Sequence, residues 1–185
     1  EDEPGFFRTV HAAFAQRRKT LLNNLARALE LTKEDAGGIL REAGIDALII
    51  TGANVTHPDL SQEPFWESLR EVFHWAQENV TSVLCSCLAT HAAMQFEHGR
   101  KRRPLPAKSS GVFPHRVIRG AHPLVNDVNT QFDVPHSRFN DISAEQFREA
   151  GLHVLVDSEA AGVHLAVSAD GFRVVYFQGH PEYDT

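Results

Sequence analysis

The chain has 185 residues, of which 42% are hydrophobic and 23% charged, as expected for one soluble globular domain with or without an appendage. Its formal net charge of −6 argues against a general nucleic-acid-binding protein. No apolar run approaches the roughly 18 residues of a membrane-spanning helix, and no signal peptide is apparent. We therefore expect a cytoplasmic protein. Its two cysteines, Cys85 and Cys87, would point to opposite faces of a strand, which favours reduced thiols.

The first part of the chain is predicted to be helical. Apolar residues recur with a helical period between Phe7 and Leu29, and a basic string at Arg17, Arg18 and Lys19 falls on the other faces. The run at 47–50 is wholly apolar, which is typical of a buried parallel strand.

The following residues alternate between strand and helix patterns. Residues 63–79 form an amphipathic helix pattern, 81–86 a buried strand and 88–98 a further helix. Short strands then come close together, with one helix at 144–150 among them. These strands are predicted at 111–118, 130–134, 153–157, 163–167 and 173–177. The order of elements predicts an α/β fold with a mostly parallel sheet.

A cysteine stands where the strand at 81–86 meets the helix at 88–98. Such a junction presents Cys87 at the carboxyl edge of the sheet, where open α/β folds bind ligands. The positive end of the helix would favour a thiolate, which is the nucleophilic form of cysteine. The alternative is that Cys87 is a small buried hydrophobic residue, which this segment alone leaves equally open. Cys85, within the strand, is assigned to the core.

A second polar motif, Gly-His-Pro-Glu-Tyr-Asp at 179–184, follows an apolar strand. His180 can accept a proton near neutral pH, and Glu182 is close enough to fix its tautomer, as in other catalytic triads. An ordinary histidine in a polar loop is the alternative. Because both motifs follow strands of one α/β pattern, we favour a cysteine acyl-transfer enzyme.

Several segments together resemble the homoserine O-succinyltransferase/O-acetyltransferase family, over about three-quarters of the chain. The matching segments are Ile49-Ile50-Thr51-Gly52-Ala53, Phe65-Trp66, Glu78-Asn79-Val80-Thr81-Ser82, Gly111-Val112-Phe113, Pro135-His136-Ser137-Arg138 and the motif at 179–184. The resemblance implies a class I glutamine-amidotransferase-like (flavodoxin-like) α/β fold. An amidotransferase itself is disfavoured, because its nucleophile usually lies in Gly-x-Cys-x-Gly and here the sequence is Ser86-Cys87-Leu88.

The resemblance also implies roles for individual residues. Cys87 would carry an acyl thioester, His180 would be the general base and Glu182 would orient it. The substrate-binding candidates are Lys108, Ser137 and Arg138. An exposed loop lysine, a turn hydroxyl and a structural ion pair are the respective alternatives. The expected oxyanion hole is formed by backbone N–H groups of Gly52, Ala53 and Leu88.

The implied reaction transfers an acyl group from succinyl-CoA or acetyl-CoA to L-homoserine, in methionine biosynthesis. Thr56 matches the family position that bears on the acyl donor. It is neutral and fairly small, so it would not repel the free carboxylate of a succinyl group. We expect succinyl-CoA as donor, no metal or other cofactor, and no membrane partner; a homodimer is left open.

Residues 6–45 resemble another family, the carboxyl-terminal helical part of bacterial 16S rRNA adenine dimethyltransferases, through the string Gln-Arg-Arg-Lys-Thr at 16–20. We therefore divide the chain into a helical segment, 1–44, of foreign or fused origin and an acyltransferase-like part, 45–185, expected to be incomplete at both ends. The alternative functions are an rRNA-binding helical module, with 1–44 as the one part expected to bind nucleic acid, and a catalytically impaired hybrid.

Overall fold

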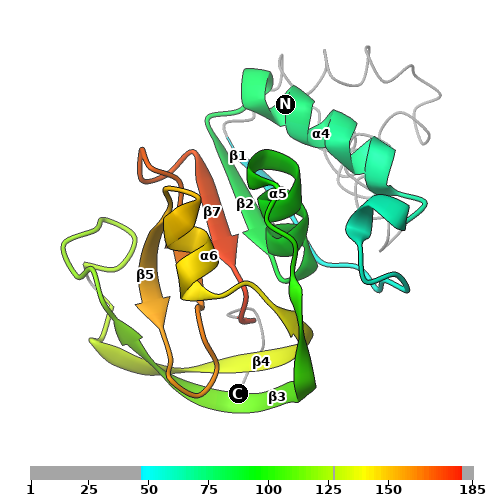
Figure 1. Cartoon of the computed structure of the whole chain (residues 1–185). Coiled ribbons are helices and arrows are strands. Elements are labelled where there is room, and N and C mark those ends of the chain that lie inside the picture. The colour runs from blue at the N-terminus through cyan, green and yellow to red at the C-terminus, as the bar shows by residue number, and fades with distance from the viewer. Residues whose placement is uncertain (1–46, 127, 181–185) are drawn as a thin grey trace, which may run out of the picture. The chain divides into compact units, whose positions relative to one another are not determined.

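The computed structural model describes residues 47–126 and 128–180 (Figure 1). Contacts divide the described residues into two compact units, one comprising 47–48 with 65–81 and the other 49–64 with the described residues from 82 to 180. The predicted helices before residue 47 lie outside the described residues. No helix among the residues that the structure describes is long and apolar enough to cross a membrane.

The first unit contains helix α4 (Trp66–Asn79). Its buried residues follow one helical stripe, at Trp66, Leu69, Val72, Phe73 and Ala76, which confirms the predicted amphipathic pattern. The helix begins three residues later than predicted. Pro64 disfavours a helical conformation at Glu63, whose backbone is extended with φ −75° and ψ 139°.

The described strands form one mixed sheet in the order β1-β2-β7-β6-β5-β3-β4. Its strands are β1 (Ala47–Ile50), β2 (Ser82–Ser86), β3 (Arg103–Val117), β4 (Gln131–Asp141), β5 (His153–Asp157), β6 (Leu165–Val167) and β7 (Val174–Phe177). β2 and β7 are parallel, whereas β3–β4, β3–β5, β5–β6 and β6–β7 are antiparallel. The predicted α/β class is correct, but a parallel majority is not found among these pairings.

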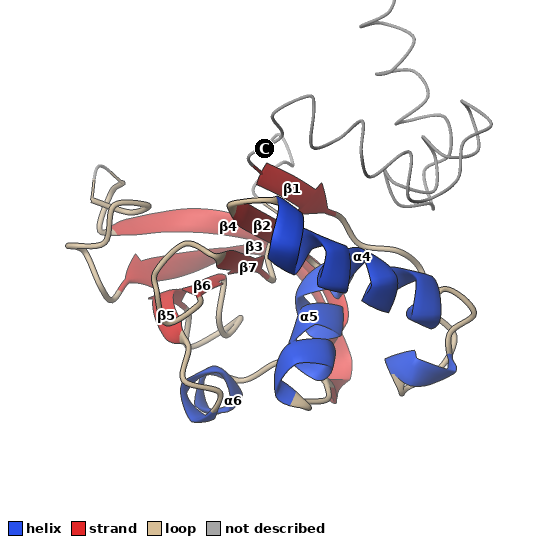
Figure 2. Ribbon diagram, turned by 90° about the horizontal axis from the view of Figure 1, so that it is seen from above, coloured by secondary structure: helices blue, strands red, loops and turns tan. Residues whose placement is uncertain are grey.

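Two helices of the second unit lie on the same face of its strands, as Figures 1 and 2 show. Helix α5 (Leu88–His98) packs against β2, and helix α6 (Ala144–Glu149) packs against β5. A capping box between Ser143 and Gln146 begins α6. The apolar core of this unit includes Val125, Leu155, Val156, Leu165, Val167 and Val175.

β3 and β4 pair into a long ribbon that crosses near the carboxyl ends of β2 and β7 (Figure 1). Both strands are longer than predicted. Most residues from Arg103 to Ser110 of β3 are exposed and show no apolar alternation, and the missed part of β4 buries the polar residues His136 and Arg138. β1 is also not the buried strand that was predicted. Leu48 is buried, but Ile49 is 65% exposed.

Candidate active site

Cys87 occupies a sharp turn between β2 and α5. It has φ 56° and ψ −117° and is the only non-glycine residue in the described chain with positive φ. Its N–H donates to the carbonyl of Phe177 at 2.8 Å, and the Thr90 hydroxyl donates to the carbonyls of Cys85 and Phe177. Such a conformation costs about 1–3 kcal/mol and persists where its surroundings fix it, commonly at functional sites. This geometry is that expected for a presented nucleophile.

The backbone at Gly52 lies directly against this turn. A Cβ atom at position 52 would be 3.3 Å from Cys87 Cβ, 3.3 Å from the Leu88 nitrogen and 3.5 Å from Cys87 Sγ. Leu88 is the first residue of α5, so its N–H has no partner within the helix and lies at the positive end of the helix dipole. Two of the three residues predicted for an oxyanion hole thus meet beside the sulfur. Ala53 follows in the same loop.

The two cysteines have different surroundings. Cys85 is completely buried, and burial raises the pKa of its thiol far above the usual value, so it stays protonated. Cys87 is only partly buried. The assignment of Cys85 to the core is confirmed.

His180 follows β7, whose parallel register pairs Ser86 with Phe177. The residues after β2 and those after β7 therefore leave neighbouring strands at one edge of the sheet. His180 is 7% exposed, and its backbone N–H donates to the carbonyl of Pro135 in β4 at 2.8 Å. Glu182, its predicted partner, lies outside the described residues.

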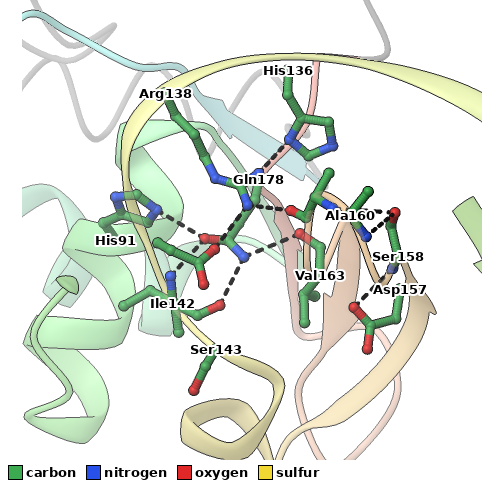
Figure 3. Close-up of polar contacts among 12 residues, drawn as sticks. His91, His136, Arg138, Ile142, Ser143, Asp157, Ser158, Ala160, Val163 and Gln178 are labelled. Carbon is green, nitrogen blue, oxygen red and sulfur yellow. Dashed lines mark hydrogen bonds and ion pairs between the residues drawn. The ribbon is translucent and has the colours of Figure 1, made fainter. Parts of the chain in front are cut away.

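Gln178 joins the end of β7 to helix α5 and to two connecting segments, at Ile142 and Val163 (Figure 3). Its amide nitrogen donates to the carbonyls of Ile142 and Val163 at 2.9 and 3.1 Å, and its amide oxygen accepts from Ile142 N–H at 2.9 Å. His91 of α5 lies 3.0 Å from the same oxygen. Burial lowers the pKa of His91 to about 4, so it donates as a neutral ring. The side chain of Gln178 thereby fixes the segment that leads into His180.

Arg138 points into the protein from β4 (Figure 3). It is 6% exposed, donates to Asp141 at 2.9 Å, and also donates to the Ala161 carbonyl and to His136. Burial lowers the pKa of Arg138, and the charges of Asp141 and Cys87 oppose that shift. These contacts favour the structural ion pair over the substrate-carboxylate role, and they place Arg138 within electrostatic range of Cys87.

The other two substrate-binding candidates lie on the opposite face of the β3–β4 ribbon. Side chains alternate along a strand, and Ser137 pairs with Ser110 while Arg138 pairs with Ser109. Lys108 is exposed, with its Nζ 5.5 Å from the ring centroid of Phe139. The register therefore does not place the three candidates in a single cluster.

Thr56 lies in a loop that is held in place by hydrogen bonds to Glu63. The Glu63 carboxylate is buried and accepts from the backbone N–H groups of Thr56 and His57 at 2.6 and 2.7 Å. Hydrogen bonds, first that from the His57 N–H, hold the pKa of Glu63 below its usual value. From the other side Arg102 donates to the carbonyls of His57 and Pro58. The loop that begins beside Cys87 at Gly52 is thus held at its far end.

The basic stretch at 100–103 is largely engaged within the protein. Arg100 pairs with Glu149, and Lys101 pairs with Asp59. Because Arg102 binds carbonyls, three of the four cations already have partners, which weakens the case for a nucleic-acid-binding patch here.

Comparison with known proteins shows the family to which the chain belongs. The homoserine O-succinyltransferase family matches residues 18–185. The chain belongs to the homoserine O-succinyltransferase family. The match includes Cys87, His180 and the Glu182 position.

Curated relatives bear the same family name. Homoserine O-succinyltransferase from Allochromatium vinosum is 74% identical over 146 residues, which are 79% of this chain and 41% of that protein. The homoserine O-succinyltransferase from Thiobacillus denitrificans is 66% identical over 79% of this chain and 42% of its own length. The chain therefore spans about two-fifths of the length of these relatives.

Solved structures support the fold. A glutamine amidotransferase from Thermotoga maritima has a TM-score of 0.59 at 11% identity, covering 73% of this chain and 55% of its own. A glutamine amidotransferase from Methylobacillus flagellatus has a TM-score of 0.58 at 16% identity, covering 75% and 53%. At these identities the likeness concerns the fold, and it confirms the predicted glutamine-amidotransferase-like class.

The homoserine O-succinyltransferase match begins at residue 18, inside the segment that resembled rRNA adenine dimethyltransferases. That second resemblance receives no support from the comparisons. The division at residue 44 stays a prediction.

Sequence reasoning missed the buried polar residues around the site, among them Gln178, Glu63 and His136. Each lies in or beside a strand or loop where a polar residue is ordinarily solvent-facing. The one signal in the sequence was their position next to motifs already recognised, such as Gln178 immediately before the Gly-His-Pro-Glu-Tyr-Asp motif.

Proposed function

We propose that this chain carries the catalytic cysteine and histidine of an acyltransferase that moves a succinyl group from succinyl-CoA to the hydroxyl of L-homoserine. The observation that carries the proposal is the strained turn at Cys87, with Gly52 and the Leu88 N–H beside the sulfur. Membership of the homoserine O-succinyltransferase family supports the choice of substrates. In the cell this reaction would serve methionine biosynthesis in the cytoplasm.

In the first step the Cys87 thiolate attacks the thioester carbonyl of the acyl-CoA. The negative charge on the carbonyl oxygen is stabilised by backbone N–H groups of Leu88 and the Gly52–Ala53 loop, where one donor is worth about 2.7–4 kcal/mol. When the carbon–sulfur bond to coenzyme A breaks, the coenzyme leaves as a thiolate that takes up a proton. The succinyl group remains as a thioester on Cys87.

In the second step His180 removes the proton of the homoserine hydroxyl, and the oxygen attacks the acyl-enzyme. The bond to Cys87 Sγ breaks, O-succinylhomoserine is released and the thiolate is restored. Glu182 orients the His180 ring and stabilises its protonated form. This sequence uses a thiolate, a base and backbone donors, with acyl-CoA as co-substrate and no further cofactor.

Intact mass after mixing with succinyl-CoA, followed by peptide mapping, tests the proposal. We expect one succinyl group on Cys87, none in Cys87→Ala, and loss of the label when L-homoserine is added. Cys85→Ala is the matched control, and it should be acylated like the unmodified chain. A label on Cys85 alone, or no label on a folded chain, would contradict the proposal.

A further inference from the structure

Three buried histidines lie against the end of β7 and take no part in the proposed reaction. His115, His136 and His164 are 1%, 2% and 3% exposed. The rings of His115 and His136 are nearly parallel with centroids 4.9 Å apart, and His164 meets them edge-on at 5.6 and 6.3 Å. Burial lowers the pKa of His136 and of His164 to about 3, and it also lowers that of His115. All three rings are therefore neutral near pH 7.

The hydrogen bonds among these groups permit only one arrangement of protons. A guanidinium only donates, so His136 Nδ1 accepts from Arg138 and the ring carries its proton on Nε2. That Nε2–H donates to His115 Nε2 at 3.1 Å, and His115 in turn donates from Nδ1 to the Phe113 carbonyl at 2.8 Å. Arg138 thus fixes the tautomers of two histidines in sequence.

Two of these histidines, His136 and His164, form the surface on which Gly179 lies. A Cβ atom at position 179 would be 2.9 Å from His136 Nε2, 2.7 Å from His164 Nδ1 and 2.6 Å from Val134 Cγ1. Real Cβ atoms essentially never come so close to such neighbours. The next residue, His180, is tied to β4 by the bond from its N–H to the Pro135 carbonyl. The backbone position of His180 therefore depends on the rings behind it.

We propose that His136 is a positioning residue for His180, with Arg138 fixing its tautomer and His164 completing the surface under Gly179. This inference rests on the proposed pairing of Cys87 with His180. A ring that turns, or a tautomer that changes, alters the surface under Gly179 and displaces the general base. Small displacements of positioning groups reduce rates on the order of 10²-fold.

Two substitutions of His136 separate its roles. His136→Asn can still accept from Arg138 but has no atom in place of Nε2, whereas His136→Gln can place a donor near the Nε2 position. We expect the maximal rate of Cys87 acylation by succinyl-CoA to fall on the order of 10²-fold in His136→Asn and less in His136→Gln. The succinyl-CoA concentration at half-maximal rate should stay unchanged, because His136 faces the protein interior.

A second measurement does not need acyl-CoA. The pH dependence of Cys87 alkylation by iodoacetamide reports the coupling of the thiol to His180. We expect the profile of His136→Asn to move towards that of His180→Asn. The exposed His74→Asn in α4, the control, should keep the original profile. If the unsubstituted chain is not acylated by succinyl-CoA, the proposed function is wrong. The pH profiles of Cys87 alkylation still show, in that case, whether His136 positions His180.

Thermal unfolding establishes that each variant is folded. If His136→Asn does not fold, Gly179→Ala decides, because its added Cβ must displace either the backbone beside His180 or the rings under it, without removing a ring. A folded His136→Asn with the original acylation rate and alkylation profile would overturn the proposal, and so would an unchanged Gly179→Ala.

Discussion

The side chain at position 56 is where a single residue is expected to select the acyl donor. Thr56 is exposed, and its hydroxyl lies 3.1 Å from His57 Nδ1. Thr56→Glu would place a carboxylate in the loop that begins beside Cys87, and this charge would repel the free carboxylate of a succinyl group. We expect kcat/KM to shift from succinyl-CoA towards acetyl-CoA by about tenfold, the effect of roughly 1.4 kcal/mol.

The control for this substitution is Thr81→Glu, which adds the same charge at an exposed position outside that loop. Its ratio of kcat/KM for the two donors should equal that of the unsubstituted chain. An unchanged ratio in Thr56→Glu would remove Thr56 from donor selection.

Among the elements, the loop between β1 and α4 contains the buried Leu60 and is also held by hydrogen bonds to Glu63. Glu63→Gln removes the charge that strengthens the bonds from the Thr56 and His57 N–H groups. We expect hydrogen exchange at these two amides to accelerate on the order of tenfold. Glu67→Gln, whose carboxylate is exposed and pairs with Arg70, should leave their exchange unchanged. Equal exchange in both variants would show that Glu63 does not hold the loop.

The elements that sequence reasoning placed well are short segments with a continuous run of buried residues. α5 and β5 have the predicted bounds, and they bury Leu88–Met94 and Val154–Val156 respectively. β3 and β4 were underestimated for different reasons. The first part of β3 carries mostly exposed side chains, whereas the last part of β4 buries the polar residues His136 and Arg138. The antiparallel pairings of β5 with β6 and of β6 with β7 were not predicted, although the connections between these strands are too short for the crossover that parallel neighbours need.

The residues of the candidate site also differ in whether the sequence could predict their positions. The strand–helix junction placed Cys87 correctly, since its position follows from local pattern alone. His136 and Gln178 could not be found in this way, because their burial depends on partners from other elements. A polar residue in a strand looks the same in the sequence whether it meets water or a buried guanidinium.

At the scale of the whole molecule, buried neutral histidines should make stability depend on pH. Burial holds the pKa of His136 and His164 near 3, below the ordinary 6.5. Below about pH 6.5 the unfolded chain therefore binds protons that the folded chain does not bind. The free energy of unfolding has its full value above about pH 6.5 and falls as the pH drops towards 3. We expect a loss at pH 5 on the order of 1–2 kcal/mol for each such histidine.

Urea denaturation at pH 7.5 and pH 5 measures this loss. His164→Gln, which removes one of the titrating groups, should show a smaller difference between the two pH values. Equal stability of the unsubstituted chain at both pH values would contradict the expectation.

The backbone conformation at position 87 favours one residue for stability, whereas the proposed reaction needs another. Because φ is 56° there, glycine suits the turn better than any residue with a side chain, and Cys87→Gly should raise stability by about 1–2 kcal/mol. A deep mutational scan of this codon would then return two opposite rankings. Selection for cellular abundance would enrich glycine, whereas selection for growth without methionine would retain cysteine. Enrichment of cysteine under both selections would show that the conformation at position 87 does not oppose stability.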